Sequence, residues 1–224
     1  MQTGKASSFA HFLFRARLLL LLSSIFGICL CILLLMVGNK ALFLWVNTHA
    51  TPRLGIAATY FSLFGEWFAM VFLIVISLWE DRKKTVGICL SWLLGACFSW
   101  TFKIWIFSGL ARPYAYFKTK NIDLQLVEGI DVHSFNTFPS GHTLTAFTSI
   151  FLFQFLFTGL KNWQIFLLFV LAMGCGLSRI ILAQHWPQDV LGGLILGILA
   201  GLTGVFIFYK LFPQMERPSA DIII

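Results

Sequence analysis

The polarity pattern along the chain consists of long apolar runs separated by short polar segments. Six runs stand out, at residues 18–39, 54–79, 85–102, 143–160, 162–178 and 190–209. Each is close to the length of about 20 residues that an α-helix needs to cross a bilayer. The runs are long and unbroken, whereas the strands of a membrane barrel would give short alternating segments. The pattern therefore predicts an all-α bundle of six transmembrane helices.

The connections between the runs add detail to this topology. The segment 41–47 is too short to span a membrane and rich in apolar residues, so we expect it to lie at the outer membrane interface. Thr51 and Pro52 have the residue types of an N-cap and a first helical position. The one long polar stretch, residues 111–138, lies between the third and fourth runs.

Composition narrows the class of protein. Of the 224 residues, 58% are apolar and 11% are charged, and the mean hydropathy is +0.86. A soluble domain has about 45–50% apolar and about 25% charged residues. These values argue against a soluble enzyme, a nucleic-acid binder and a disordered protein. The net charge of +7 does not change this, because most basic residues lie at the ends of apolar runs, as in membrane proteins.

The distribution of Lys and Arg predicts the orientation in the membrane. With both termini in the cytoplasm, the cytoplasmic segments, which include Lys5 and Arg217, carry more basic residues than the outer ones. This count sets aside Lys103, Arg112 and Arg179 as residues of a site. We expect a cytoplasmic N-terminal segment, a membrane domain and a cytoplasmic tail at residues 1–17, 18–210 and 211–224. The first run is too long for a signal peptide and is followed by no small-residue cleavage site.

Chemically active side chains gather at the helix ends that this topology places outside. They are Lys103, Arg112, Ser140, Gly141, His142, Arg179, His185 and Asp189. Three cations at one place repel each other unless an anion joins them, and each cation–anion pair is worth about 4 kcal/mol at about 4 Å in a dielectric near 20. The helix starts at Ser140 and Pro187 add free N–H groups. The cluster therefore predicts a phosphate site.

The histidines indicate what the site does to a phosphate. His185 and Asp189 are four residues apart and share one face of a helix. Asp189 can accept a hydrogen bond from the proton-bearing ring nitrogen of His185, which leaves the other nitrogen free to attack. His142 lies at another helix start and can protonate the leaving oxygen. We expect no metal, since the histidines lack a third ligand and the five cysteines lie inside apolar stretches.

These residues resemble the three-part signature of the type 2 phosphatidic acid phosphatase (PAP2) superfamily. The parts are Lys103…Arg112–Pro113, Pro139–Ser140–Gly141–His142 and Ser178–Arg179…His185…Asp189. The resemblance covers residues 40–210 and implies metal-independent cleavage of lipid phosphomonoesters or diphosphates through a phosphohistidine. It implies His185 as nucleophile, Asp189 as its partner and His142 as acid. It also implies a phosphate-binding set of Lys103, Arg112, Ser140, Gly141 and Arg179.

Two features depart from the simple pattern. Eight residues separate Lys103 from Arg112, where the family usually has about six, and two extra helical residues would turn the pair by roughly 200°. Gly109 and Pro113 indicate that the chain has left the helix there, so that a loop absorbs the insertion.

Glu66 interrupts the second run. An acid in such a run faces protein or water, and pairing with a cation of the site is one alternative.

The sequence therefore predicts an integral membrane phosphatase of the bacterial inner membrane, with its active site at the extracytoplasmic helix ends. Its expected partners are the bilayer and a phosphorylated lipid: undecaprenyl diphosphate, phosphatidylglycerol phosphate, phosphatidate or lipid A phosphate. We expect no cofactor, nucleic acid or obligatory protein partner. A lipid phosphotransferase with the same site is the alternative. An anion or lipid transporter would show inverted repeats and broken helices, and the spans argue against a haloperoxidase with the same motifs.

Overall fold

The computed structural model describes residues 8–213, and these form helices and loops without a strand. Residues 1–7 and 214–224, with Lys5 and Arg217 and much of the two predicted terminal segments, lie outside the described residues. The elements are α1 (Ser8–Val37), α2 (Asn39–Thr48), α3 (Pro52–Leu63), α4 (Trp67–Glu80), α5 (Arg82–Thr101), a π-helix (Phe102–Ile106), α6 (Pro113–Lys118), α7 (Gly141–Leu156), α8 (Asn162–Ile181) and α9 (Pro187–Leu211). The predicted all-α class is confirmed.

Five segments of the described chain are long and apolar enough to cross a membrane. They are Phe9–Val37, Pro52–Glu80, Arg82–Ile106, Asn162–Ile181 and Pro187–Leu211. Helix α7 coincides with the fourth apolar run but has 16 residues, fewer than the about 20 that span a bilayer. A sixth span therefore stays a prediction.

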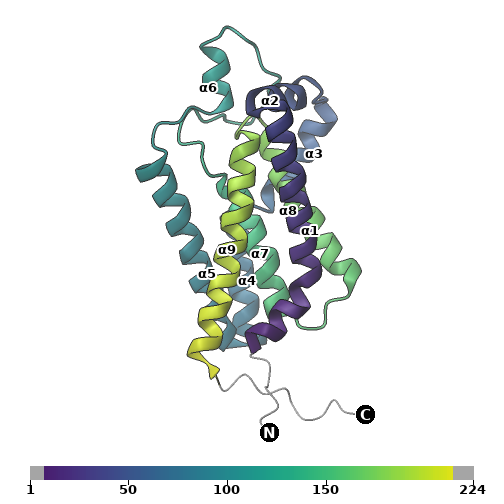
Figure 1. Ribbon diagram of the computed structural model, residues 1–224, viewed down its shortest axis with the longest axis vertical. Helices are drawn as coiled ribbons and strands as arrows, with labels where there is room; N and C mark the ends of the chain where they lie inside the picture. Colours follow the sequence, from purple (N-terminus) through teal and green to yellow (C-terminus); the bar gives the residue numbers. More distant parts are fainter. Residues whose placement is uncertain (1–7, 214–224) are drawn as a thin grey trace.

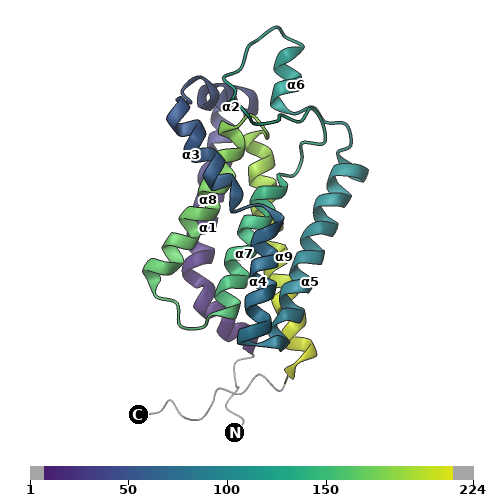
Figure 2. The same cartoon turned by 180° about the vertical axis from the view of Figure 1, so that it is seen from behind.

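Helix α7 forms the centre of the bundle. It packs against α9, α8, α4, α5 and α1, and Phe147, Ile150 and Phe151 on it are fully buried. Helix α9 approaches it closely, because a Cβ atom at Gly197 would lie 2.5 Å from the backbone oxygen of Leu144. Figures 1 and 2 show the long helices side by side, with α2 and α6 at one end of the bundle. Helices α7 and α9 begin at that end, which brings their N-termini together.

The second apolar run is not the continuous helix that its length predicts. Thr51 caps α3 through Leu54 N, and Pro52 is its first residue, as expected. The helix then breaks at residues 64–66, where three successive N–H groups bond only three residues back. The break packs on the start of α7: a Cβ atom at Gly65 would lie 2.6 Å from the backbone oxygen of His142. The expectation of one helix was wrong because this tertiary contact outweighs the local pattern.

The chain leaves the helix between Lys103 and Arg112, as Gly109 and Pro113 indicate. A π-helical turn holds Lys103, Gly109 has a φ of 75°, and Arg112 directly precedes α6. Non-helical residues thus absorb the longer spacing, and no 200° rotation of the pair results.

Aromatic and amide contacts close the bundle end that carries α2 and α6. Phe43 of α2 stacks on Phe117 of α6 and meets the edge of Trp186. Asn47 exchanges two hydrogen bonds with the backbone of Gln125, at 2.8 and 3.0 Å. These contacts tie the long connection after α6 to α2, and so fix the loops that surround the site.

Candidate active site

The structure brings all eight sequence-predicted site residues to one end of the bundle. Ser140 caps α7, and its N–H donates to the backbone oxygen of Asp189 at 3.0 Å. Gly141 opens α7 beside the Lys103 amine, which would lie 3.5 Å from a Cβ at that position. His185 lies close enough to interact electrostatically with Lys103, Arg112, His142 and Arg179.

His185 and Asp189 form a buried pair at the turn between α8 and α9. Their side chains are 2% and 0% exposed, and His185 Nδ1 lies 3.4 Å from Asp189 Oδ2. The same oxygen accepts hydrogen bonds from the Trp186 N–H, at 2.9 Å, and from the Thr137 hydroxyl. Asp189 therefore caps α9 and faces the histidine at once, with its carboxylate held by three donors.

Arg112 approaches the other ring nitrogen of His185. Its Nη1 lies 3.3 Å from His185 Nε2 and donates to the backbone oxygen of Gln184 at 3.0 Å. Its Nε donates to the backbone oxygen of Phe135 at 3.0 Å. The loop before α7, which contains Phe135, and the loop before α9, which contains Gln184, thus hold the guanidinium. Its charge is fixed beside His185 Nε2, the ring nitrogen that does not face Asp189.

Burial and the surrounding cations keep His185 neutral. Burial is the largest cause that lowers the pKa of His185 well below 6.5, and the charges of Arg112, Arg179, Lys103 and His142 act in the same direction. A neutral imidazole carries a lone pair on one of its two ring nitrogens.

Arg179 lies in the last turn of α8 and is positioned by a residue from a different helix. Its guanidinium donates to the hydroxyl of Ser62, at the end of α3. Its backbone oxygen accepts the N–H of His185 at 3.0 Å. The buried Nε of Arg179 has no hydrogen-bond partner, so an anion bound here would satisfy it.

His142 has a more open surrounding than His185. Its Nε2 lies 2.9 Å from Glu66 Oε1, and the two side chains are 25% and 37% exposed. Glu66 stands at the break between α3 and α4. The lone acid of the second run therefore pairs with a histidine of the site.

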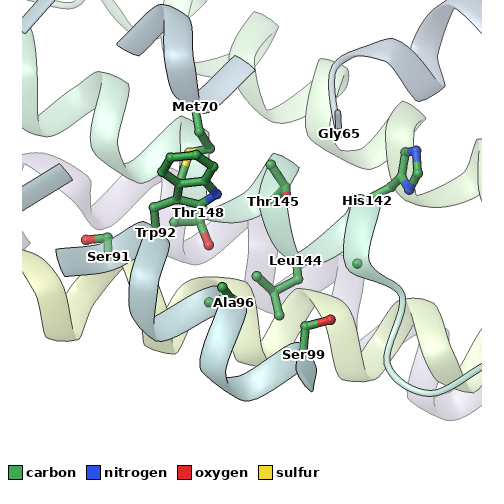
Figure 3. A pocket seen from close by; sticks show the side chains of 12 residues that line it. Gly65, Met70, Ser91, Trp92, Ala96, Ser99, His142, Leu144, Thr145 and Thr148 are labelled. Carbon is green, nitrogen blue, oxygen red and sulfur yellow. The ribbon is translucent and has the colours of Figure 1, made fainter. Parts of the chain in front are cut away.

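A cavity of about 200 Å³ adjoins His142 and Gly141 and lies between α4, α5 and α7. Figure 3 shows His142 at one end and Met70 and Ser91 at the other. Its lining is mixed, with Trp92 and Met70 among small and hydroxyl-bearing side chains.

Three residues that the motifs do not include also hold the site together: Ser62, Thr137 and Gln184. Their residue types give no signal, because a Ser or Thr in an apolar helix or loop commonly bonds its own backbone. Their partners come from packing between distant segments. In residues 8–213 no group of three or more His, Cys, Asp or Glu side chains comes together in a way that could hold a metal ion.

The sequence is similar to proteins described as lipid phosphatases. It is 39% identical over 77 residues to the lipid A 1-phosphatase of Porphyromonas gingivalis, which is 34% of this chain and 17% of that protein. It is 27% identical over 192 residues to the putative undecaprenyl-diphosphatase YbjG of Escherichia coli, covering 81% of this chain and 91% of that protein. The chain thus spans about a sixth of the Porphyromonas relative and nearly all of the Escherichia one.

Two solved structures have a similar fold. Aquifex aeolicus LpxE has a TM-score of 0.64 and 25% identity, with 75% of this chain and 94% of that chain covered. A transmembrane PAP2-type phosphatidylglycerolphosphate phosphatase from Bacillus subtilis has a TM-score of 0.58 and 21% identity, with 91% and 98% covered. Together with the apolar helices, these folds identify a multi-pass integral membrane protein. The model of the PAP2 superfamily matches residues 84–213, and the chain therefore belongs to this superfamily.

Proposed function

We propose that the protein is a membrane phosphatase that hydrolyses a lipid phosphomonoester or diphosphate through a phosphohistidine at His185. One observation carries the proposal: the buried imidazole of His185 is held between the Asp189 carboxylate and the Arg112 guanidinium. The carboxylate orients one ring nitrogen, and the cation lies where a phosphate would meet the other.

In the first step the phosphate binds among Lys103, Arg112 and Arg179 and the N–H groups at the start of α7. His185 Nε2 attacks phosphorus, a P–N bond forms and the P–O bond to the lipid breaks. His142 donates a proton to the leaving oxygen. Asp189 stabilises the positive charge that develops on His185.

In the second step water replaces the lipid. His142, now neutral, takes a proton from the attacking water, the P–N bond breaks and inorganic phosphate leaves. His185 is then neutral again and His142 is protonated, as at the start. The three cations supply the charge that a metal ion supplies elsewhere, so we propose that no metal is needed.

The cavity beside His142 supports a lipid as the substrate. It continues from the polar site between three helices of the bundle, so a headgroup and its chain can be held together. Among the four candidate lipids we favour a lipid diphosphate, since the relative matched along 91% of its length is described as a putative undecaprenyl-diphosphatase.

Phosphate release from purified protein tests this function. Undecaprenyl diphosphate, phosphatidylglycerol phosphate, phosphatidate and lipid A phosphate are compared with and without millimolar EDTA. We expect release from at least one lipid, resistance to EDTA and inhibition by vanadate, which mimics the pentacoordinate phosphorus. Loss with EDTA that Mg²⁺ or Zn²⁺ restores would contradict the mechanism. Transfer of phosphate to a second lipid without release would indicate a phosphotransferase.

We further propose six membrane helices, with α7 as the shortest, both termini in the cytoplasm and the site outside the bacterial inner membrane. In this arrangement residues 18–210 form the membrane domain between the segments 1–17 and 211–224. Helix α1 begins and α9 ends at the bundle end opposite α6 (Figure 1), which supports a common side for the two.

Impermeant maleimide labelling of intact cells tests the orientation. In a background without the five native cysteines, His133→Cys lies in the exposed loop before α7 and Lys161→Cys in the exposed turn before α8. We expect labelling of the first variant only. Labelling of the second variant alone would reverse the proposed topology.

A further inference from the structure

Glu66 is a carboxylate of the site that no motif includes. It lies outside residues 84–213, the part that the superfamily model matches. It occupies the N-cap position of α4, yet its side chain makes no hydrogen bond to that helix. Instead, Glu66 Oε1 lies 2.9 Å from His142 Nε2. A carboxylate that leaves its own helix N-terminus uncapped to meet a catalytic histidine has a role beyond helix capping.

The helix break determines where this carboxylate stands. Gly65 lies so close to α7 that a Cβ atom would be 2.7 Å from His142 Cβ, and Figure 3 shows Gly65 and His142 at the same end of the cavity. Ser62, before the break, holds Arg179. Residues on the two sides of the break therefore contact two different parts of the site. Ser62 bonds the phosphate-binding Arg179, and Glu66 pairs with His142.

The charges around His142 show why an acid is needed. Arg179 and Lys103 both lie close enough to interact electrostatically with His142, and each opposes a positive imidazolium. In residues 8–213 the ion pair recorded for His142 is the one with Glu66. The carboxylate thus offsets part of the repulsion that the phosphate-binding cations impose on a protonated His142.

We propose that Glu66 is a positioning residue that holds His142 by Nε2 and favours its protonated form, so that Nδ1–H delivers the proton to the leaving lipid oxygen. This inference rests on the proposed role of His142 as the acid. When the P–O bond breaks, the Nδ1 proton moves to the oxygen, and the Nε2 proton stays on the ring, hydrogen-bonded to Glu66. In the second step the free Nδ1 accepts a proton from water, and the pair is restored.

Leaving-group dependence tests the proposal. Glu66→Gln, Glu66→Asp and the matched control Glu80→Gln, an exposed acid at the far end of α4, are assayed on the lipid substrate and on p-nitrophenyl phosphate. Its nitrophenolate leaves without a proton. We expect Glu66→Gln to lower kcat on the lipid about 10- to 100-fold, a part of the 10²- to 10⁴-fold typical of general acids. On p-nitrophenyl phosphate we expect the initial burst of nitrophenolate, which reports the first step alone, to change by less than about threefold, and Glu66→Asp should recover part of the lipid rate.

A double variant separates action through His142 from a general structural effect. If Glu66 acts through His142, Glu66→Gln lowers kcat no further in a His142→Ala background. Equal losses on both substrates, or a further loss in that background, would overturn the proposal. Different results would contradict the proposed function itself: the wild-type protein would form no phosphoenzyme, or His185→Ala would keep full phosphate release.

Discussion

The two histidines of the site sit in opposite surroundings. His185 and Asp189 are 2% and 0% exposed, come from one turn of the chain and are 3.4 Å apart. His142 and Glu66 are 25% and 37% exposed, lie 76 positions apart in sequence and are 2.9 Å apart. The first pair is assembled within a motif, and the second only by the packing of α4 against α7.

This difference matches the two roles that we propose for the histidines. A nucleophile gains from a dry, fixed position in which it stays neutral, and burial provides both. An acid that later takes a proton from water must remain accessible, so it needs a charged partner in place of burial. The comparison predicts that substitutions at the buried pair abolish the chemistry, whereas those at the open pair depend on the leaving group.

The largest effect is expected for His185→Ala. Removal of the attacking nitrogen should abolish both turnover and covalent labelling by a radiolabelled substrate. Labelling in acid-quenched samples measures this, with His133→Ala in the exposed loop before α7 as a control. A phosphoenzyme in His185→Ala but not in His142→Ala would exchange the roles of the two histidines.

Asp189→Asn should come next. The amide keeps the shape of the carboxylate but loses the charge that fixes the ring proton of His185, and loss of this role in a comparable triad costs about 10⁴-fold in kcat. We expect a fall of about 10³- to 10⁴-fold with little change in KM. Steady-state kinetics on the lipid measure both, and a raised KM at unchanged kcat would assign Asp189 to binding instead.

His142→Ala should have a smaller and conditional effect. We expect kcat on the lipid to fall about 10²- to 10⁴-fold, as for loss of a general acid. A substrate with a good leaving group should recover part of this loss, because its oxygen needs little protonation. Recovery in His185→Ala rather than in His142→Ala would break the comparison between the two regions.

The pH profile sharpens the comparison further. Since burial and nearby cations hold the pKa of His185 well below 6.5, its neutral form persists as the pH falls from neutrality through that value. The acid limb of kcat/KM that reports His185 should therefore appear only below pH 6.5. A half-loss at pH 6.5 in the free enzyme would indicate an unshifted, hydrated histidine.

Ser62→Ala should give the smallest effect. It removes the hydroxyl that accepts a hydrogen bond from Arg179, at a cost of about 1 kcal/mol, or about fivefold. The inhibition constant of vanadate measures this, with Ser77→Ala as the control. Ser77 is also buried and lies near the other end of α4. Its hydroxyl bonds the backbone oxygen of Ile74 and the hydroxyl of Thr85. An equal change in both variants would point to loosened packing.

Much of this protein is determined by short-range pattern. The apolar runs predict its helices, since a chain in lipid must satisfy its own backbone. The starts of α3, α7 and α9 follow from Thr51, Ser140 and Pro187. The contact between His185 and Asp189 follows from their closeness in sequence, although His185 lies in the loop two residues before α9 and not on a shared helical face as expected. Each of these predictions needs only neighbouring residues.

Tertiary structure alone decided the rest. The break at residues 64–66, the pairing of Glu66 with His142 and the bond from Arg179 to Ser62 each join segments far apart in the chain. A single glycine in an apolar run is only a weak local signal for a break, and Gly65 stands there because the start of α7 leaves no room for a side chain. Local propensity differs little between a straight and a broken helix, so close packing against a second helix selects between them.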